Sequence, residues 1–595
     1  MDDFIFGTLD TEAQRLERYK GSRLGIYHGG KRTPLDPLPD QPVTLSVWVG
    51  SPIYPLGGWI YYTTDGSDPI GEKGKALQGQ AVELEWASSQ WDDLIWGYYH
   101  PLQGTLPEQA DQTIVRYRIS ILTADDVEIF ADNGTYYAYV VDTFTPPEWS
   151  KNAIIYHIFV DRFARPKGET WNSVASLEDI FGGNLRGILD HLDYLQNLGV
   201  NTLYLSPIFP SSSHHRYDAT DYFNIDPIVG DKQDFKQLLD TLHRQGMHLI
   251  LDFVPNHWSD QHPTFRQATS DSKSPYREWY IFTRYPDNYE CFFNVPCMPK
   301  VNLRNPQARA YMIEAAQYWL KFGVDGFRID HAIGPTPDFW ADFRLQTRKT
   351  NPECWTIGEI IESPFIQLTY FGLLDGCLDF LLLEALRQTF ATQQWSAQKL
   401  ASFLMGHYSL FPEGYSLPSF LDNHDMDRFI LAAGGDIRKL KLAALCQFAL
   451  PGIPIIYYGT EVGLSQRRGI RDKKRGFGKL EEARLPMLWG DEQNQDLFRF
   501  YQQLIQFRQQ AGSLWNRNIS IQLATTDLLV FRKPSQEKEF LVCLNISDRS
   551  QSLFLEPGWD KIALATEENF PHPTLTPNNK PHITLSPYSG LILIK

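Results

Sequence analysis

Eight short apolar segments, separated by amphipathic segments with helical periodicity, occupy the middle of the chain and restrict the folds that it can adopt. The apolar segments lie at residues 153–160, 202–207, 247–254, 324–330, 355–359, 376–382, 417–423 and 453–459. The helical pattern is clearest at residues 185–199, 235–246 and 308–323. Short strands that alternate with helices form parallel sheets, because each helix carries the chain back to the start of the next strand. Eight such units over about 310 residues predict an α/β fold, a (β/α)8 TIM barrel.

Segments with the two-residue alternation of β-strands flank this barrel on both sides. Those before it lie at residues 43–50, 59–66, 113–122 and 135–142, and those after it lie at 528–533, 539–546, 582–587 and 590–595. Asp65-Gly66 and Asn133-Gly134 supply turns in the first group. We therefore predict an N-terminal β-sandwich at residues 1–145, the barrel at residues 146–512 and a C-terminal β-sandwich at residues 513–595.

Charge, cysteine content and apolar runs exclude several classes of function. Asp and Glu (71) outnumber Lys and Arg (55), and the net charge of −16 repels phosphate backbones, so we expect no nucleic-acid partner. Six cysteines without a C-x-x-C pair are too few for a disulfide scaffold, so we expect reduced thiols. The first residues lack the pattern of a secretory leader, and Pro451, Gly452 and Pro454 interrupt the uncharged stretch at residues 442–460. We expect no membrane span and a cytoplasmic location.

Charged side chains occur where several of the predicted barrel strands end. In chain order they are Asp252, Arg328, Asp330, Glu359, His424 and Asp425. A single acidic residue at a strand end is more often a helix cap or a loop hydrogen-bonding group. Barrel active sites, however, lie at the C-terminal ends of the strands, so these side chains are expected to converge on one face. Several carboxylates beside one arginine favour a catalytic site over a set of caps.

The spacing of these residues suits the cleavage of a glycosidic bond. Arg328 and Asp330 are two positions apart on a strand and share a face, where the guanidinium would favour an ionised Asp330. Glu359 ends a mostly apolar run, where desolvation would raise its pKa and keep it protonated. An ionised carboxylate facing a protonated carboxyl is the arrangement for glycoside cleavage, and a separation of about 5–5.5 Å predicts retention of configuration. Asp425 would be a third carboxylate, able to stabilise a cationic sugar ring.

A long segment at residues 257–305, after the third strand, is predicted to form an inserted loop domain. It is rich in Trp, Tyr, Phe and Pro, and a loop of this length inside a compact domain is usually functional. Trp258, Tyr280, Phe292 and Phe293 have two interpretations. They fill a small core of the loop itself, or they stack on the C–H faces of sugar rings. We include Trp258 among the predicted substrate-binding residues.

Several short segments resemble the signature regions of the α-amylase superfamily of retaining α-glucan enzymes. DFVPNH (252–257), GFRIDHA (326–332), GEI (358–360) and FLDNHD (420–425) resemble its four main regions, in the right order. MPKVN (298–302) resembles a motif of the neopullulanase, cyclomaltodextrinase and maltogenic amylase group. SPIFPSSSHHRYDATDYFNIDP (206–227) and GIPIIYYGTEVGL (452–464) resemble the regions of the second and eighth strands. The resemblance covers residues 149 to about 512 and implies the same barrel fold.

The resemblance also implies a role for each matching residue. The catalytic ones are Asp330 as nucleophile, Glu359 as general acid and base, and Asp425 as stabiliser of the transition state. The substrate-binding ones are Arg328, which orients the nucleophile, His257 and His424, which bind sugar hydroxyls, Tyr217, which stacks on the sugar, and Asp252, whose role is mainly structural.

The sequence departs from the family pattern at two places. Ile333-Gly334 stand where many α-amylases have Lys-His, which removes a ligand of the usual calcium site and leaves Asn256 as weak evidence for structural calcium. We expect no required cofactor and assign no metal ligand. Glu359 is followed by Ile360-Ile361-Glu362, where the neopullulanase group often has Trp-His, so the binding site for the leaving sugar is expected to differ.

The predicted function is a retaining α-glucan hydrolase that cleaves α-1,4 bonds, with α-1,6 bonds as a further option, in maltodextrins, cyclodextrins or related oligosaccharides. A transglycosylase, a debranching enzyme or a glucoside isomerase on the same site is the alternative. A third hypothesis is a non-catalytic carbohydrate-binding scaffold. The residues Arg328, Asp330, Glu359 and Asp425 argue against it, because a scaffold has no chemical need for these four charged side chains. The N-terminal domain is open to glycan binding, to covering the active site, to forming a homodimer or to packing on the barrel.

Overall fold

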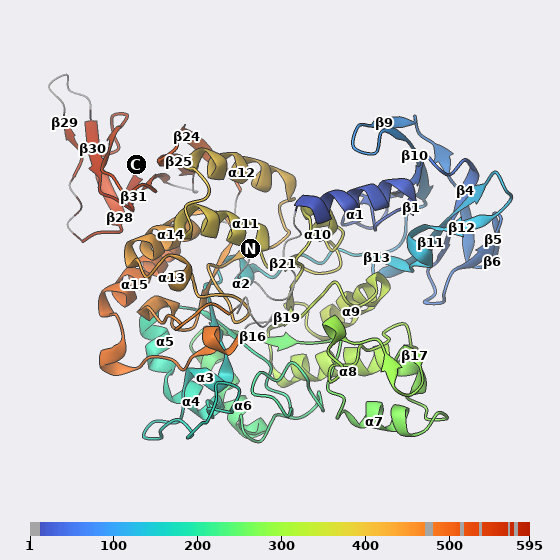
Figure 1. Ribbon diagram of the computed structural model, residues 1–595, viewed down its shortest axis with the longest axis horizontal. Coiled ribbons are helices and arrows are strands. Elements are labelled where there is room, and N and C mark those ends of the chain that lie inside the picture. The colour runs from blue at the N-terminus through green and yellow to red at the C-terminus, as the bar shows by residue number, and fades with distance from the viewer. Residues whose placement is uncertain are drawn as a thin grey trace.

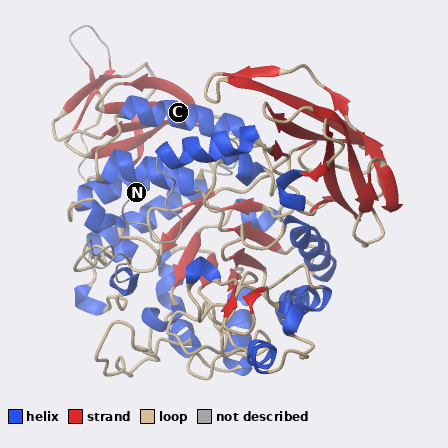
Figure 2. Ribbon diagram, turned by 45° about the vertical axis from the view of Figure 1, so that its right-hand side comes forward, coloured by secondary structure: helices blue, strands red, loops and turns tan. Residues whose placement is uncertain are grey.

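The computed structural model describes residues 12–470, 480–511, 517–534, 538–568, 570, 572–575 and 581–595. A barrel of strands and helices lies in the middle, with an N-terminal domain of strands on one side and a C-terminal domain of strands on the other (Figures 1 and 2). The predicted start of the C-terminal domain, residue 513, lies outside the described residues.

Eight parallel strands form the barrel, as the sequence predicts. They are β14 (Ile155–Ile158), β15 (Thr202–Leu205), β16 (His248–Phe253), β19 (Gly326–Ile329), β20 (Trp355–Gly358), β21 (Gly376–Cys377), β22 (Pro418–Ser419) and β23 (Ile453–Tyr457). They pair in the order β21-β20-β19-β16-β15-β14-β23-β22. Backbone bonds close the ring between the end strands, from Cys377 N to Ser416 O at 3.0 Å and from Asp379 N to Pro418 O at 2.9 Å.

Helices cover the outside of the barrel (Figure 2). The main ones are α4 (Leu185–Asp190), α5 (Leu192–Leu198), α6 (Lys232–Arg244), α8 (Pro306–Phe322), α9 (Pro337–Thr350), α10 (Pro364–Leu368), α11 (Phe380–Leu386), α12 (Ala397–Leu410), α14 (Ile437–Ala449) and α15 (Gln495–Gln510). The uncharged stretch at residues 442–460 is part of α14, a turn and β23, as expected from its prolines. Across the described residues, no helix combines the length and the apolar character that a membrane crossing requires.

Several predicted elements are longer than those in the structure, and the run 417–423, for example, is a strand only at Pro418–Ser419. The run 376–382 is a strand only at Gly376–Cys377, because the Asp379 carboxylate accepts from Leu382 N (2.9 Å) and starts α11. The helical stretch 185–199 is broken at His191, whose φ and ψ of −110° and 16° separate α4 from α5.

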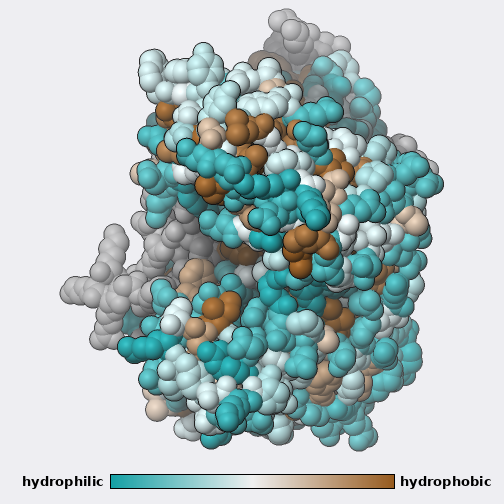
Figure 3. Space-filling view, turned by 90° about the vertical axis from the view of Figure 1, so that its right-hand side faces the viewer, coloured by the Kyte–Doolittle hydropathy of each residue, from teal (hydrophilic) through white to brown (hydrophobic). Residues whose placement is uncertain are grey.

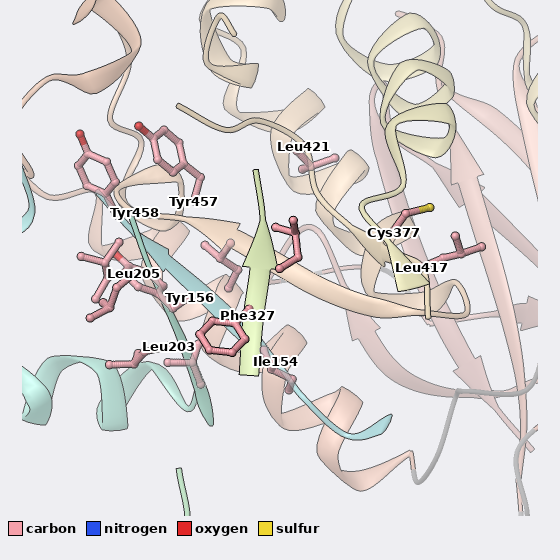
Figure 4. Packing of buried hydrophobic residues seen from close by; sticks show 14 of the residues in the cluster. Ile154, Tyr156, Leu203, Leu205, Phe327, Cys377, Leu417, Leu421, Tyr457 and Tyr458 are labelled. Atoms are coloured by element: carbon pink, nitrogen blue, oxygen red, sulfur yellow. The ribbon is translucent and has the colours of Figure 1, made fainter. Parts of the chain in front are cut away.

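The alternation of side chains along each strand places several of the predicted site residues on the interior face of the barrel. Ile155, Tyr204, Ile250, Ile357 and Ile455, one from each of five strands, share an interior cluster. Side chains at alternate positions of the strands belong to a second cluster, which includes Ile154, Tyr156, Leu203, Leu205 and Phe327 (Figure 4). Because side chains two apart point the same way, Asp252 continues the face of Ile250, and Glu359 continues the face of Ile357.

The N-terminal domain is a sandwich of two sheets that enclose one core. One sheet contains β1 (Ile26–Tyr27), β2 (Arg32–Thr33), β3 (Val43–Gly50), β8 (Glu85–Trp86), β9 (Gln90–Asp92) and β10 (Gly97–Leu106). The other contains β4 (Pro55–Thr63), β7 (Gln80–Glu83), β11 (Thr113–Thr123), β12 (Glu128–Phe130) and β13 (Tyr137–Val141). The surface of this side of the molecule is mostly polar, with separate hydrophobic patches (Figure 3).

The four predicted strands of this domain correspond to β3, β4, β11 and β13, and its other elements were not predicted, among them strand β10 and one helix. Strand β10 contains Gly97, Pro101 and Gly104, which argue against a strand in the sequence. In the structure a Cβ on Gly104 would lie 2.5 Å from Ile60 Cδ1, so glycine permits the close approach of the two sheets. Helix α1 (Glu12–Leu24) precedes the sandwich where β structure was expected, and it extends between the sandwich and the barrel (Figure 1).

The C-terminal domain also consists of two sheets around its own core. They contain β24 (Ser520–Ala524), β25 (Leu528–Pro534), β26 (Glu539–Asn545), β28 (Lys561–Ala565) and β31 (Ser589–Ile594) in one, and β27 (Gln551–Phe554), β29 (Thr574–Leu575) and β30 (Pro581–Leu585) in the other. The four segments predicted as strands here coincide with β25, β26, β30 and β31.

Candidate active site

A pocket of about 310 Å³ opens at the C-terminal ends of the barrel strands. Its walls include six of the nine residues predicted from the sequence, namely Asp330, Glu359, Asp425, His257, His424 and Tyr217. All three predicted catalytic carboxylates therefore line one cavity, although they come from loops that follow three different strands.

Arg328 joins three carboxylates at the base of this pocket. Its Nη1 donates to both oxygens of Asp252 (2.9 and 3.0 Å) and to Oδ1 of Asp330 (2.9 Å). Its Nη2 lies 2.7 Å from Oε1 of Glu359. The side chain of Arg328 is fully buried, so the fork of one guanidinium holds Asp330 and Glu359 toward the same part of the pocket.

Asp252 lies beneath the pocket and does not line it. Besides Arg328, its Oδ2 accepts hydrogen bonds from the hydroxyls of Tyr204 (2.7 Å) and Tyr217 (2.8 Å). Of these three partners only Tyr217 lines the cavity, so Asp252 acts on the pocket through other side chains, and its mainly structural role stays a prediction.

Asp425, which also lines the pocket, is held by a second set of polar and charged side chains. Oδ1 accepts from Nη2 of Arg484 (2.9 Å), and Oδ2 lies 3.0 Å from Nε2 of His424. The ring of His424 stacks on Tyr217 at 5.3 Å, and its Nε2 lies 2.7 Å from the Tyr217 hydroxyl. Burial alone would raise the pKa of Asp425, but His424, Arg484 and Arg328 more than offset it, so this pKa is lowered and the carboxylate stays ionised.

Burial dominates the titration of the other two carboxyls. It raises the pKa of Glu359 above its ordinary 4.5 and the pKa of Asp330 well above its ordinary 3.8. Arg328 opposes both shifts, while the charge of Asp425 adds to both. The prediction of a raised pKa for Glu359 is confirmed in direction. Arg328 favours the ionised form of Asp330, as predicted, but desolvation outweighs this effect and the pKa of Asp330 is raised. Because the charge of Glu359 raises the pKa of Asp330 further, the two carboxyls share one proton before both ionise.

The inserted domain contributes one wall of the pocket. His257 stacks on Phe292 at 4.3 Å, and Phe292 and Phe293 both line the cavity. Burial lowers the pKa of His257 to about 3, so its imidazole is neutral at ordinary pH. Within the described part of the chain, His257 Nε2 is a buried atom without a hydrogen-bond partner. A neutral, unpaired ring nitrogen on the wall suits a sugar hydroxyl.

Trp258 does not take part in this wall, so its prediction as a substrate-binding residue is wrong. Its side chain is fully buried, stacks on His262 at 4.2 Å and donates from Nε1 to the Tyr280 hydroxyl at 2.7 Å. Trp258 and Tyr280 therefore fill the core of the inserted domain, while Phe292 and Phe293 face the pocket. The core-filling interpretation therefore holds for Trp258 and Tyr280, and stacking on sugar rings stays a prediction for Phe292 and Phe293.

Oδ1 of Asn256 is buried and has no hydrogen-bond partner within the part of the chain that the structure describes. A Cβ on Gly334 would lie only 2.0 Å from this oxygen, so glycine leaves the space beside it open. Among the described residues, no three His, Cys, Asp or Glu side chains are grouped so that they could hold a metal ion. The absence of a required metal stays a prediction.

We expect dialysis against EDTA to leave both the glucan-hydrolysing rate and the melting temperature unchanged, the latter within about 2 °C. Differential scanning fluorimetry and a reducing-sugar assay, before and after adding back CaCl₂, measure both. A loss on dialysis that calcium restores would show that the chain does bind a structural ion.

The structure adds pocket residues that the sequence did not indicate. Arg484 follows Asp425 by dozens of residues, and no pattern near it suggests a site. His331 lies inside the quoted segment GFRIDHA and donates from its backbone N to Glu359 Oε2 at 3.1 Å. Arg18 and Glu362 also line the cavity, and Arg18 comes from α1 of the N-terminal domain.

Comparisons with known proteins agree with this geometry. Residues 157–496 match the family model described as the catalytic domain of α-amylase. The chain is 40% identical over 553 residues to an α-amylase 2 of Dictyoglomus thermophilum, covering 92% of this chain and 93% of that one. It is 36% identical to neopullulanase 2 of Thermoactinomyces vulgaris, covering 77% and 80%. Among solved structures, an acarbose-soaked debranching enzyme of Nostoc punctiforme matches with a TM-score of 0.65 and 30% identity, covering 76% of this chain and 100% of that one.

Proposed function

The chain belongs to the α-amylase family, and from this premise we propose that it is a retaining hydrolase of α-glucan oligosaccharides. The observation that carries the proposal is the pair Asp330 and Glu359, held by one buried guanidinium at the base of a cavity that His257, His424 and Tyr217 also line. The neopullulanase name of one relative supports an α-glucan as the substrate.

The proposed reaction is a double displacement. Asp330 attacks the anomeric carbon while Glu359 gives its proton to the leaving oxygen, so that the glycosidic C–O bond breaks as the bond to Asp330 forms. Glu359, now a carboxylate, removes a proton from water, and the resulting hydroxide oxygen displaces Asp330 from the sugar. Asp425, kept ionised by Arg484 and His424, stabilises the positive charge on the sugar ring in both transition states.

The shared proton of the carboxyl pair suits this division of roles. One proton must be on Glu359 and none on Asp330 when the substrate is bound. Arg328 donates a hydrogen bond to Asp330, and its positive charge favours the ionised form of Asp330. When the substrate is bound, its glycosidic oxygen accepts a hydrogen bond from protonated Glu359, and the shared proton then stays on Glu359.

A product time course by chromatography tests the proposal. Maltotriose, a cyclodextrin, pullulan and soluble starch serve as substrates. We expect release of glucose and maltose from the small or cyclic substrates to be faster than from starch, because the pocket has a volume of only about 310 Å³. Products longer than the substrate would support a transglycosylase, and no turnover of any of the four would contradict the proposal.

The pH dependence of kcat/KM follows from the carboxyl pair. Activity requires that the pair holds one proton, so the rate rises as the first proton leaves and falls as the second leaves. Burial raises the pKa of both groups, so the falling limb is expected at a pH clearly above 4.5, the ordinary value for Glu359. Initial rates on maltotriose across pH 3–9 measure this, and a decline centred at or below pH 4.5 would contradict it.

We also propose a cytoplasmic location. All six cysteines are free in the structure, and four of them are buried, which agrees with a reducing compartment. A homodimer formed through the N-terminal domain stays a prediction.

A further inference from the structure

Helix α1 brings one residue of the N-terminal domain to the active site of the same chain. Nη1 of Arg18 donates to both oxygens of Glu362, at 2.9 and 3.1 Å, and both residues line the catalytic pocket. The side chain of Glu362 is 16% exposed and that of Arg18 is 55% exposed, so the pair lies at the mouth of the cavity.

The position of Glu362 assigns this pair to one side of the pocket. Glu362 follows Glu359 by three residues, and Ile361 between them also lines the cavity. The leaving sugar must lie against Glu359, because this residue protonates the oxygen that departs with it. The loop after Glu359, and with it Arg18, therefore borders the place of the leaving sugar.

The sandwich holds α1 in this position by polar contacts. The Tyr19 hydroxyl donates to Asp92 of β9, and Nε of Arg23 lies 3.7 Å from the same carboxylate. The Arg23 guanidinium also lies over the ring of Tyr99, at 4.4 Å. Leu16 and Leu24 of α1 are exposed, so these contacts, more than apolar burial, fix the helix.

We infer that Arg18, oriented by Glu362, binds the leaving sugar of the α-glucan substrate. The inference rests on the proposed function. A guanidinium presents five N–H donors in a planar fork, which suits sugar hydroxyls as well as a carboxylate. The pair thus stands in the region where the sequence departs from the Trp-His of the neopullulanase group.

The test compares Arg18→Ala with the control Arg15→Ala. Arg15 is an exposed arginine of the same helix, and it does not line the pocket. Glu362→Gln is the second variant, since it keeps the shape and removes the charge that orients Arg18. The substrates are maltotetraose, soluble starch and an aryl α-maltoside, whose leaving group is a phenol and not a sugar. Kinetics give kcat and KM for each, and melting curves check that all variants fold.

We expect Arg18→Ala to lower kcat/KM for maltotetraose about three- to tenfold, mainly through KM, which corresponds to the loss of one or two hydrogen bonds. The effect on the aryl maltoside is expected to be smaller, so the ratio of kcat/KM for maltotetraose to that for the aryl maltoside falls. Starch also has a sugar as its leaving group, so kcat/KM for starch should fall together with that for maltotetraose. Glu362→Gln should lower the ratio of maltotetraose to aryl maltoside in the same way, and Arg15→Ala should leave it unchanged.

Equal ratios in Arg18→Ala and Arg15→Ala would overturn this inference and leave the proposed function intact, because the wild-type enzyme would still cleave all three substrates. Failure of the wild-type enzyme to cleave any of them would overturn the proposed function, and the inference with it.

Discussion

Replacing Asp330 by asparagine is expected to lower kcat on maltotriose by about 10⁴-fold or more, because the amide cannot form the covalent bond to the sugar. Folding should be preserved. Asparagine has nearly the same shape, and Arg328 keeps its contacts with Asp252 and Glu359. Since burial raises the pKa of Asp330, a neutral amide also avoids the cost of burying a charge.

Steady-state kinetics and a thermal melt measure the two parts of this prediction. Asp240→Asn is the matched control, because Asp240 is an exposed carboxylate on α6 that is paired with Lys236 at 2.7 Å and does not line the pocket. A rate near that of the wild-type enzyme in Asp330→Asn would show that another group is the nucleophile.

Replacing Glu359 by glutamine is expected to produce a loss that depends on the leaving group. A sugar alkoxide leaves poorly without a proton, so kcat/KM for maltotriose should fall by about 10³-fold. An α-glucosyl fluoride needs no such proton, so the first chemical step with this substrate should be affected much less. Single-turnover kinetics with both substrates measure the difference. Equal losses for the two would contradict the role of Glu359 as the general acid.

The barrel and the centre of the site could be predicted from the sequence, because both depend on local periodicity. Each strand is a short apolar run, and the side chain at its C-terminal end shares the interior face with the residue two positions earlier. This rule places Asp252 and Glu359 correctly once the strand ends are known. Arg328 and Asp330 follow from the same two-residue spacing, and the structure joins them by a direct hydrogen bond.

The parts that could not be predicted depend on contacts between distant segments. Arg484 meets Asp425 only because the chain returns to the pocket after the eighth strand. Arg18 reaches Glu362 across 344 positions, from a polar helix without a periodic apolar face. The role of Trp258 depended on which way one side chain of the inserted domain turns, and composition does not determine that direction. The pKa of Asp330 depended on the depth of its burial, which outweighed the arginine beside it.

The anomeric configuration of the first product tests the central claim most directly. Proton NMR, recorded within the first minutes of maltotriose hydrolysis, separates the α- and β-anomers before mutarotation mixes them. Two successive displacements at the anomeric carbon, first by Asp330 and then by water, predict that the α-anomer appears first. Initial release of the β-anomer would mean a single displacement by water, and it would contradict the assignment of Asp330 as a covalent nucleophile.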